Sequence, residues 1–285
     1  MNKFYAFFIS LFFSFQAYSQ KAAYKIYDKG GNPVVYDSLI SAVKNQDIVL
    51  FGELHNNPIV HWMRLEIIKS LNKQRKSLIL GGEFFESDVQ VVIDEYMSGF
   101  IPMSHLIREA RPWDNFRTDY EPMFEFAYAN KLPFVASNIP RRYAGLVARE
   151  GLNKLDELDA RAKEWIAPLP FSYDPLLPGY KRLLDAPDHG HSMPYMADAQ
   201  AIKDGTMAHF ILMNWTPGKL FFHINGAYHS DNFEGIYWHL KRHLRQLNIS
   251  TFSSVEQVDI NTLDPKFLGK ADFIIVVPSD MTKTH

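Results

Sequence analysis

Residues 47–58 constrain the fold more than any other stretch, because they join a buried strand, a polar turn and the start of a helix. Residues 48–51 form an unbroken apolar run with β-branched members, which is typical of a strand covered on both faces of a parallel sheet. Gly52-Glu53-Leu54-His55 follows directly, and Pro58 is favoured in the first turn of a helix. Open α/β folds build sites from such turns at the carboxyl edge of the sheet.

A second stretch of the chain has the same arrangement. The apolar residues 220–225 precede Gly226-Ala227-Tyr228-His229, which repeats the Gly-x-x-His spacing of residues 52–55. One Gly-x-x-His arises often by chance. Two copies at the ends of two predicted strands indicate that both turns belong to one site.

Two more predicted strands end in polar turns. Residues 77–80 end at Gly81-Gly82-Glu83, and residues 133–136 end at Ser137-Asn138. Helical patterns separate the strands, so we expect an α/β fold with a mostly parallel sheet flanked by helices and a smaller helical cap sub-domain. Near the start, residues 24–36 surround a Gly-Gly turn and predict a β-hairpin.

The N-terminal residues 1–19 predict a secretory signal peptide. A basic start is followed by the apolar residues 4–15 and by Ala17-Tyr18-Ser19, which fits a small-x-small cleavage site. An uncleaved membrane anchor is the alternative, but the apolar run is shorter than the roughly 20 residues that span a bilayer. No later stretch is long and apolar enough to span one, so we expect an exported chain, periplasmic or secreted.

The composition excludes several classes of protein. The chain has no cysteine, which rules out a disulfide framework, thiolate metal ligands and a lipid-modified cysteine. Its formal net charge of −2, from 30 basic and 32 acidic residues, gives no electrostatic case for binding nucleic acid. We expect residues 20–285 to form a single domain, with cap-forming insertions at about 84–118 and 150–196.

Four side chains form the centre of the expected site. In a parallel sheet, Glu53, His55, Glu83 and His229 would all open on the same edge. Oxygen and nitrogen donors without sulfur suit a divalent ion such as Mn, Fe, Co or Zn. Such an ion could activate water while a free carboxylate acts as general base. The four residues are therefore candidate metal ligands and candidate catalytic residues, although their spacing matches no common zinc signature.

Each of these residues also has a structural interpretation. Glu53 could stabilise the N-terminus of the following helix through its charge. His55 or His229, taken singly, could be a histidine that packs and hydrogen-bonds in the interior. Glu83 is harder to explain in this way, because a buried carboxylate without a partner is costly.

Further candidates lie on the predicted helices and loops. Tyr195 and Tyr228 could ligate a haem iron through the phenolate. His239 and His243, four apart on a predicted helix, could bind a metal, but we interpret them as part of a solvated basic face. The complete set of candidate cofactor-binding residues is His55, His61, Asn138, Tyr195, Gln200, Asp204, Tyr228 and His229.

Several ordered motifs resemble the ChaN-like haem-binding uptake family, which is related more distantly to the Tiki metalloproteases and the erythromycin esterases. These motifs are Gly52-Glu53-Leu54-His55-Asn56-Asn57-Pro58 with His61, Gly82-Glu83-Phe84-Phe85-Glu86, Asp119-Tyr120-Glu121-Pro122, Ala136-Ser137-Asn138-Ile139-Pro140-Arg141, Ala199-Gln200-Ala201-Ile202-Lys203-Asp204 with Met207-Ala208, and Asn225-Gly226-Ala227-Tyr228-His229. The resemblance implies an exported, iron-related protein that binds haem between protomers, with the iron held by tyrosine. Its Tiki side implies metal-dependent peptide cleavage at the same Gly-x-x-His and Glu positions.

Three hypotheses follow from the sequence. The first is an exported haem-binding protein for iron or haem acquisition, with haem as its ligand and a homodimer as its assembly. The alternative is a metal-dependent hydrolase, peptidase-like or esterase-like, that uses the Glu and His cluster. A structural module without a ligand is the third option. The chain departs from the lipoprotein members of the family, because it has no cysteine for lipid attachment.

Overall fold

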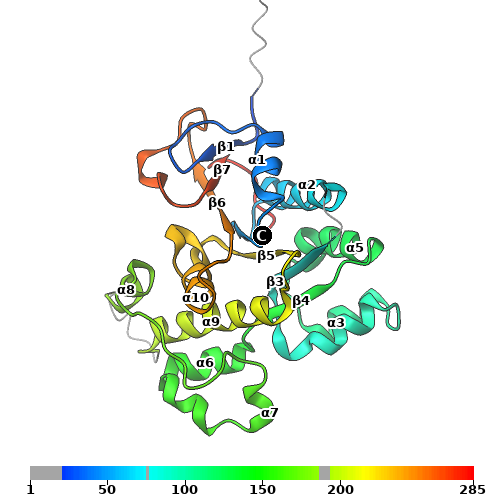
Figure 1. Ribbon diagram of the computed structural model, residues 1–285, viewed down its shortest axis with the longest axis vertical. Coiled ribbons are helices and arrows are strands. Elements are labelled where there is room, and N and C mark those ends of the chain that lie inside the picture. Colours follow the sequence, from blue (N-terminus) through cyan, green and yellow to red (C-terminus); the bar gives the residue numbers. More distant parts are fainter. Residues whose placement is uncertain (1–20, 75–76, 186–192) are drawn as a thin grey trace, which may run out of the picture.

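A computed structural model describes residues 21–74, 77–185 and 193–285. Within these residues one seven-stranded sheet has the order β1-β7-β6-β2-β5-β3-β4 (Figure 1). The strands are β1 (Lys25–Asp28), β2 (Ile48–Glu53), β3 (Leu78–Glu86), β4 (Phe134–Asn138), β5 (Leu220–Gly226), β6 (Ile249–Gln257) and β7 (Phe273–Pro278). All neighbours are parallel except β1, which pairs antiparallel with β7. The expected α/β fold with a mostly parallel sheet is confirmed.

Helices flank the sheet on both faces (Figure 1). The helices are α1 (Tyr36–Val43), α2 (Pro58–Gln74), α3 (Gln90–Met97), α4 (Met103–Ala110), α5 (Glu121–Ala129), α6 (Arg141–Glu150), α7 (Ala160–Lys163), α8 (Pro178–Leu184), α9 (Met196–Asn214) and α10 (Ile236–His243). None of the described helices is long and apolar enough to cross a membrane. The predicted signal peptide lies outside the described residues.

The central strand β2 shows why the apolar run of the sequence has no alternation. Val49 and Phe51 pack into one core together with residues of α1, α2 and α5. Ile48 and Leu50 point to the other face and pack with residues of α9 and α10. Because both faces are covered, all six residues of β2 are buried.

The register of the strands brings their polar ends together. Gly52 and Glu53 of β2 lie opposite Asn225 and Gly226 of β5. The neighbouring strand β3 was expected to end near residue 80, yet it continues to Glu86, with a register shift between Gly82 and Glu86 where it pairs with β4. Glu83 therefore belongs to an irregular part of the strand instead of the turn after it.

The predicted N-terminal hairpin forms only in part. Tyr27 makes a single antiparallel bridge with Pro33. No second strand follows, because Pro33 lacks a backbone N–H and the chain enters α1 at Tyr36. β1 instead joins the sheet at its edge beside β7.

Candidate functional site at the carboxyl edge of the sheet

Glu53 is a buried carboxylate with two strong partners. The Tyr120 hydroxyl donates to Glu53 Oε1 at 2.6 Å, and the Arg64 guanidinium donates to Oε2. Arg64 is itself fully buried and lies over the Tyr120 ring, 4.8 Å from its centroid. Burial alone would raise the pKa of Glu53, but the charge of Arg64, together with the hydrogen bond to His55 and the charges of His61 and His55, lowers the pKa to about 2. Glu53 is therefore ionised across the physiological pH range.

Two histidines flank Glu53. His55 Nδ1 lies 3.4 Å from Glu53 Oε1, and the His55 ring stands edge-on to Trp113 with the centroids 4.5 Å apart. Burial acts to lower the pKa of His55, but its hydrogen bond to Glu53 and the charge of Glu83 raise it. His61 is more deeply buried, between Glu53 at 3.8 Å and Asp119 at 3.4 Å, and burial lowers its pKa. Of the two imidazoles, His55 is the one with an exposed edge.

A second cluster has His229 between two carboxylates. His229 Nε2 lies 3.1 Å from Glu83 Oε1, and Nδ1 contacts Asp204 Oδ1. Burial alone would lower the pKa of His229, but Glu83 and Asp204 together raise it to about 10. His229 is therefore a buried imidazolium at neutral pH, and its charge in turn lowers the pKa of Glu83 against the effect of burial.

The two clusters meet at Gly226. Its backbone N–H donates to Glu83 Oε2 at 2.8 Å. A Cβ atom at this position would lie only 2.5 Å from His55 Nε2, so the His55 ring packs directly against the glycine backbone. The structure thus brings Glu53, His55, Glu83 and His229 into one neighbourhood, as the matched strand ends predict.

The other predicted residues divide into two groups. Gln200 contacts His229 at 2.9 Å, and the Asn138 amide donates to the Glu83 carbonyl oxygen at 3.0 Å while its Oδ1 is buried without a partner among the described residues. The two tyrosines lie farther out. The Tyr228 hydroxyl donates to the Gly179 carbonyl oxygen at 2.6 Å, and Tyr195 is 43% exposed at the start of α9.

The structure gives no support to the predicted metal site at Glu53, His55, Glu83 and His229. Across residues 21–74, 77–185 and 193–285, no group of three or more metal-ligating side chains is arranged to hold an ion. The physical reason is that each carboxylate already has a base as partner. Arg64 neutralises Glu53, and His229 carries a proton instead of presenting a free nitrogen to a metal.

Sequence reasoning missed the buried base Arg64. Arg64 occupies the apolar stripe of α2 that contains Val60, Ile67 and Leu71, all of which are buried. A charged residue on such a stripe is buried only when it has a partner of opposite charge. The position of Arg64 in this apolar pattern could therefore have predicted a buried ion pair. His223 was also missed; it is fully buried and hydrogen-bonded to Ser137 at 2.7 Å.

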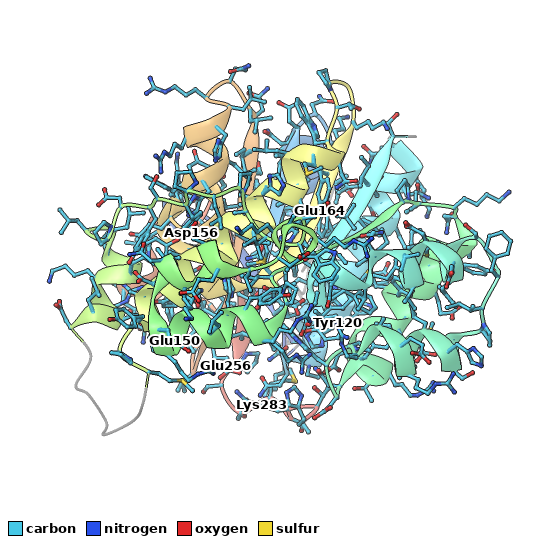
Figure 2. The ribbon with its side chains drawn as sticks, turned by 90° about the horizontal axis from the view of Figure 1, so that it is seen from below. Tyr120, Glu150, Asp156, Glu164, Glu256 and Lys283 are labelled. Carbon is cyan, nitrogen blue, oxygen red and sulfur yellow. The ribbon has the colours of Figure 1, made fainter. Side chains whose placement is uncertain are left out.

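Two open grooves lie beside these clusters and share Trp113 and Arg141. The first has a volume of about 670 Å³ and is bordered by His55 and by the C-terminal residues. An ion pair of 2.6 Å between Lys283 and Glu256 holds this C-terminal segment (Figure 2).

The second groove, of about 390 Å³, lies between α6 and α9, and we refer to it as the α6–α9 groove. Its floor is polar and most of its wall is apolar. It is lined by Glu83, Glu86, Trp113, Asn138, Ile139, Arg141, Ala144, Gly145, Ala148, Met193, Met196, Ala199 and Lys203.

A parallel sheet whose carboxyl edge carries paired acids and bases beside open grooves is the arrangement of α/β proteins that bind a ligand at their strand ends. The chain belongs to the haem-binding uptake family of the Tiki superfamily, ChaN, whose model matches residues 39–240. None of the curated protein sequences matches the chain.

Solved structures share the fold. The chain is similar to ChaN of Campylobacter jejuni, a structure described as showing cofacial haem binding, with a TM-score of 0.67 and 16% identity over 90% of this chain and 97% of that one. A Bacillus cereus protein has a TM-score of 0.52 and 11% identity, over 85% of this chain and 90% of its own. A succinoglycan biosynthesis protein has a TM-score of 0.50 and 11% identity over the same shares. At these identities the likeness shows the fold alone.

Proposed function

We propose that this chain is an exported haem-binding protein that serves haem or iron acquisition, and that the haem lies in the α6–α9 groove. Family membership supports the ligand class, and the chemistry of the groove supports its location. Export is proposed from the signal-peptide pattern of residues 1–19.

The observation that carries the location is the combination of apolar walls and the cation of Lys203. Trp113, Ile139 and Met196 give the groove apolar surface for a macrocycle. Arg141 and Lys203 line it as well, and Arg141 forms an ion pair with Glu86. Lys203 forms no ion pair with any described residue, so its ammonium is free to meet a propionate. Mostly apolar walls with a few placed charges are the usual composition of a cofactor site.

Tyr195 is the better placed of the two predicted tyrosines. It lies in sequence between Met193 and Met196, which line the groove, and its ring packs 3.5 Å from the Cβ position of Gly151. Neither tyrosine is itself among the lining residues of the groove, but Tyr195 is adjacent in sequence to Met196, whereas the hydroxyl proton of Tyr228 is held by the Gly179 carbonyl oxygen. Tyrosinate is an established axial ligand of haem iron. We therefore assign iron ligation to Tyr195.

We propose a homodimer on the basis of the exposed residues beside the groove. Met193, Tyr195 and Met196 are 47%, 43% and 44% exposed, which leaves an apolar edge for a second copy to cover once haem is bound. The Campylobacter jejuni protein, described as binding haem cofacially, shares this fold. Light scattering with and without haemin checks this point, and the proposal expects the mass to double on haemin addition.

Haemin titration of two matched tyrosine variants tests the assignment. Wild-type protein should give a saturable shift of the Soret absorbance at micromolar concentration. Tyr195→Phe should lose the tyrosinate-to-iron charge-transfer absorbance and bind haemin at least tenfold more weakly. Tyr228→Phe, a similarly exposed tyrosine away from the groove, should behave as wild type. Unaltered spectra for Tyr195→Phe would remove the ligand assignment, and no saturable shift for wild type would remove the function.

A metal-dependent hydrolase is the alternative, and it has less support. Two of its proposed metal ligands already have charged partners, because Glu53 pairs with Arg64 and Glu83 pairs with His229. Elemental analysis of protein prepared without chelator distinguishes the two functions. A stoichiometric divalent metal retained by wild type and lost in Glu83→Gln would favour the hydrolase.

A further inference from the structure

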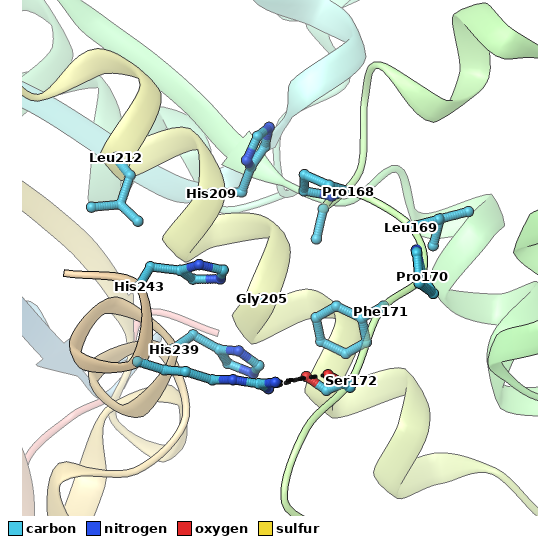
Figure 3. Close-up of a pocket in the computed structure, with 12 residues that line it drawn as sticks. Pro168, Leu169, Pro170, Phe171, Ser172, Gly205, His209, Leu212, His239 and His243 are labelled. Atoms are coloured by element: carbon cyan, nitrogen blue, oxygen red, sulfur yellow. Dashed lines mark hydrogen bonds between the residues drawn. The ribbon is translucent and has the colours of Figure 1, made fainter.

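A separate cavity of about 370 Å³ lies between α9, α10 and the segment 167–172 (Figure 3). None of its lining residues belongs to the acid and base clusters or to the α6–α9 groove. It is lined by Ala167, Pro168, Leu169, Pro170, Phe171, Ser172, Gly205, His209, Leu212, His239, Arg242 and His243. Its volume is at the lower end of the roughly 300–1,000 Å³ typical of small-molecule sites.

The titratable groups that line this cavity are all bases. His209, His239, His243 and Arg242 line it, and no aspartate or glutamate does. His239 was expected on a solvated face, but it is 98% buried, and its Nε2 has no hydrogen-bond partner among the described residues. A buried nitrogen without a hydrogen-bond partner destabilises the fold, unless a ligand or a water molecule in the cavity forms a hydrogen bond with it.

The wall of the cavity is flat and aromatic. The Phe171 and His239 rings lie 5.4 Å apart with an interplanar angle of 31°. Phe171 can pack so closely on α9 because residue 205 is glycine, where a Cβ atom would lie 2.2 Å from the Phe171 ring. The cavity therefore presents a surface suited to a planar ring.

Arg242 supplies the charge at the mouth of the cavity. Its guanidinium donates to the Ser172 carbonyl oxygen at 2.8 Å and to the Ser172 hydroxyl at 2.9 Å (Figure 3). These two bonds fix the guanidinium in place and leave its other N–H groups available. A fixed guanidinium with free donors is suited to a carboxylate.

Two of the histidines, His239 and His209, act here as neutral hydrogen-bonding groups. Burial, followed by the charges of His243 and Arg242, lowers the pKa of His239 to about 3. Burial and His243 also lower the pKa of His209. The three imidazoles are not arranged to share a metal ion, since no such group exists within the described part of the chain.

We propose that this cavity binds a small aromatic carboxylate, with its ring against Phe171 and His239 and its carboxylate on Arg242. The site is independent of the haem groove and does not require the haem proposal to hold. A one- or two-ring acid matches the volume, the flat wall and the single fixed cation.

Isothermal titration calorimetry with two acids and their neutral amides tests the proposal. The probes are benzoate and indole-3-acetate, each compared with benzamide or indole-3-acetamide. We expect saturable binding of at least one acid, and at least tenfold weaker binding of its amide. No saturable heat for either acid up to millimolar concentration, or equal affinity for acid and amide, overturns the proposal.

Two variants and a control locate the binding. Arg242→Gln should weaken binding at least tenfold, and His209→Trp should abolish it by filling the cavity from a partly exposed position. Arg245→Gln, which removes an exposed charge just beyond α10, should leave the affinity unchanged. Each variant is first shown to unfold at the wild-type denaturant midpoint. Unchanged affinity in both Arg242→Gln and His209→Trp places the acid elsewhere and overturns the proposal.

Discussion

Buried charges at the strand ends exist because each has a specific partner. Glu53 pairs with Arg64, and Glu83 pairs with His229, whose other nitrogen faces Asp204. Removing one partner of a buried pair typically costs about 3–5 kcal/mol, because the remaining charge stays in a low-dielectric interior. The acid and base cluster is therefore a determinant of stability as well as the polar border of the groove.

The stability of His229→Leu measures this coupling. The change leaves Glu83 and Asp204 buried without their shared cation, so we expect a loss of about 3–5 kcal/mol in the free energy of unfolding. Urea titration followed by circular dichroism gives the value. His105→Leu, at an exposed position on α4, serves as the control and should change stability by less than about 0.5 kcal/mol. A loss below about 1 kcal/mol in His229→Leu would show that the pair is not coupled.

The stability difference between wild type and His229→Leu should decrease as the pH rises. The pKa of His229 rises from 6.5 in the unfolded chain to about 10 in the fold. Its stabilising contribution is thus complete below pH 6.5 and is lost as the pH rises through 10. The stability difference between wild type and His229→Leu should be largest near pH 6 and should shrink toward pH 10. A difference that stays constant or grows with pH contradicts the raised pKa.

At the scale of elements, the sequence predicted the strands from their apolar runs and the common edge from the turns that follow them. It could not predict the order of the strands, which depends on how helices pack across both faces. The end of β3 was predicted too early, because Gly81-Gly82 is typical of a turn. In the structure the strand continues to Glu86, with a register shift after Gly82. Tyr120 was missed as a partner of Glu53 because it lies 67 residues away in the sequence. Arg64, only 11 residues away, was missed although it lies on the apolar stripe of α2.

The close approach of the central strands depends on Gly52. A Cβ atom here would lie 2.5 Å from the Phe252 carbonyl oxygen and 3.0 Å from the Ala227 Cα. Both are backbone atoms that cannot rotate away, so Gly52→Ala should destabilise the protein by about 3 kcal/mol. Chemical denaturation measures the loss.

Gly145→Ala is the matched control for Gly52→Ala. Its nearest neighbour would be the flexible Arg149 side chain at 3.4 Å, and it lies inside α6. Alanine is favoured over glycine in a helix, so this variant should gain about 0.5–1 kcal/mol. Equal effects of the two substitutions would show that the strands can separate without cost.

At the scale of the whole molecule, two different sites lie in separate parts of the fold. The carboxyl edge of the sheet combines the charged clusters with the α6–α9 groove, where we place the haem. The cavity between α9 and α10 lies apart from that edge and is lined by three histidines and Arg242. Helix α9 contributes residues to both sites, with Met196 and Lys203 on one and His209 on the other.

Blocking the groove tests the haem site most directly. Gly145 lines the groove, and no main-chain atom lies near its Cβ position, so Gly145→Trp places an indole where we locate the macrocycle. Haemin titration followed at the Soret band should show saturable micromolar binding for wild type and Gly145→Ala. Gly145→Trp should bind at least tenfold more weakly while it unfolds at the same midpoint. Equal haemin affinity in wild type and Gly145→Trp would contradict the account.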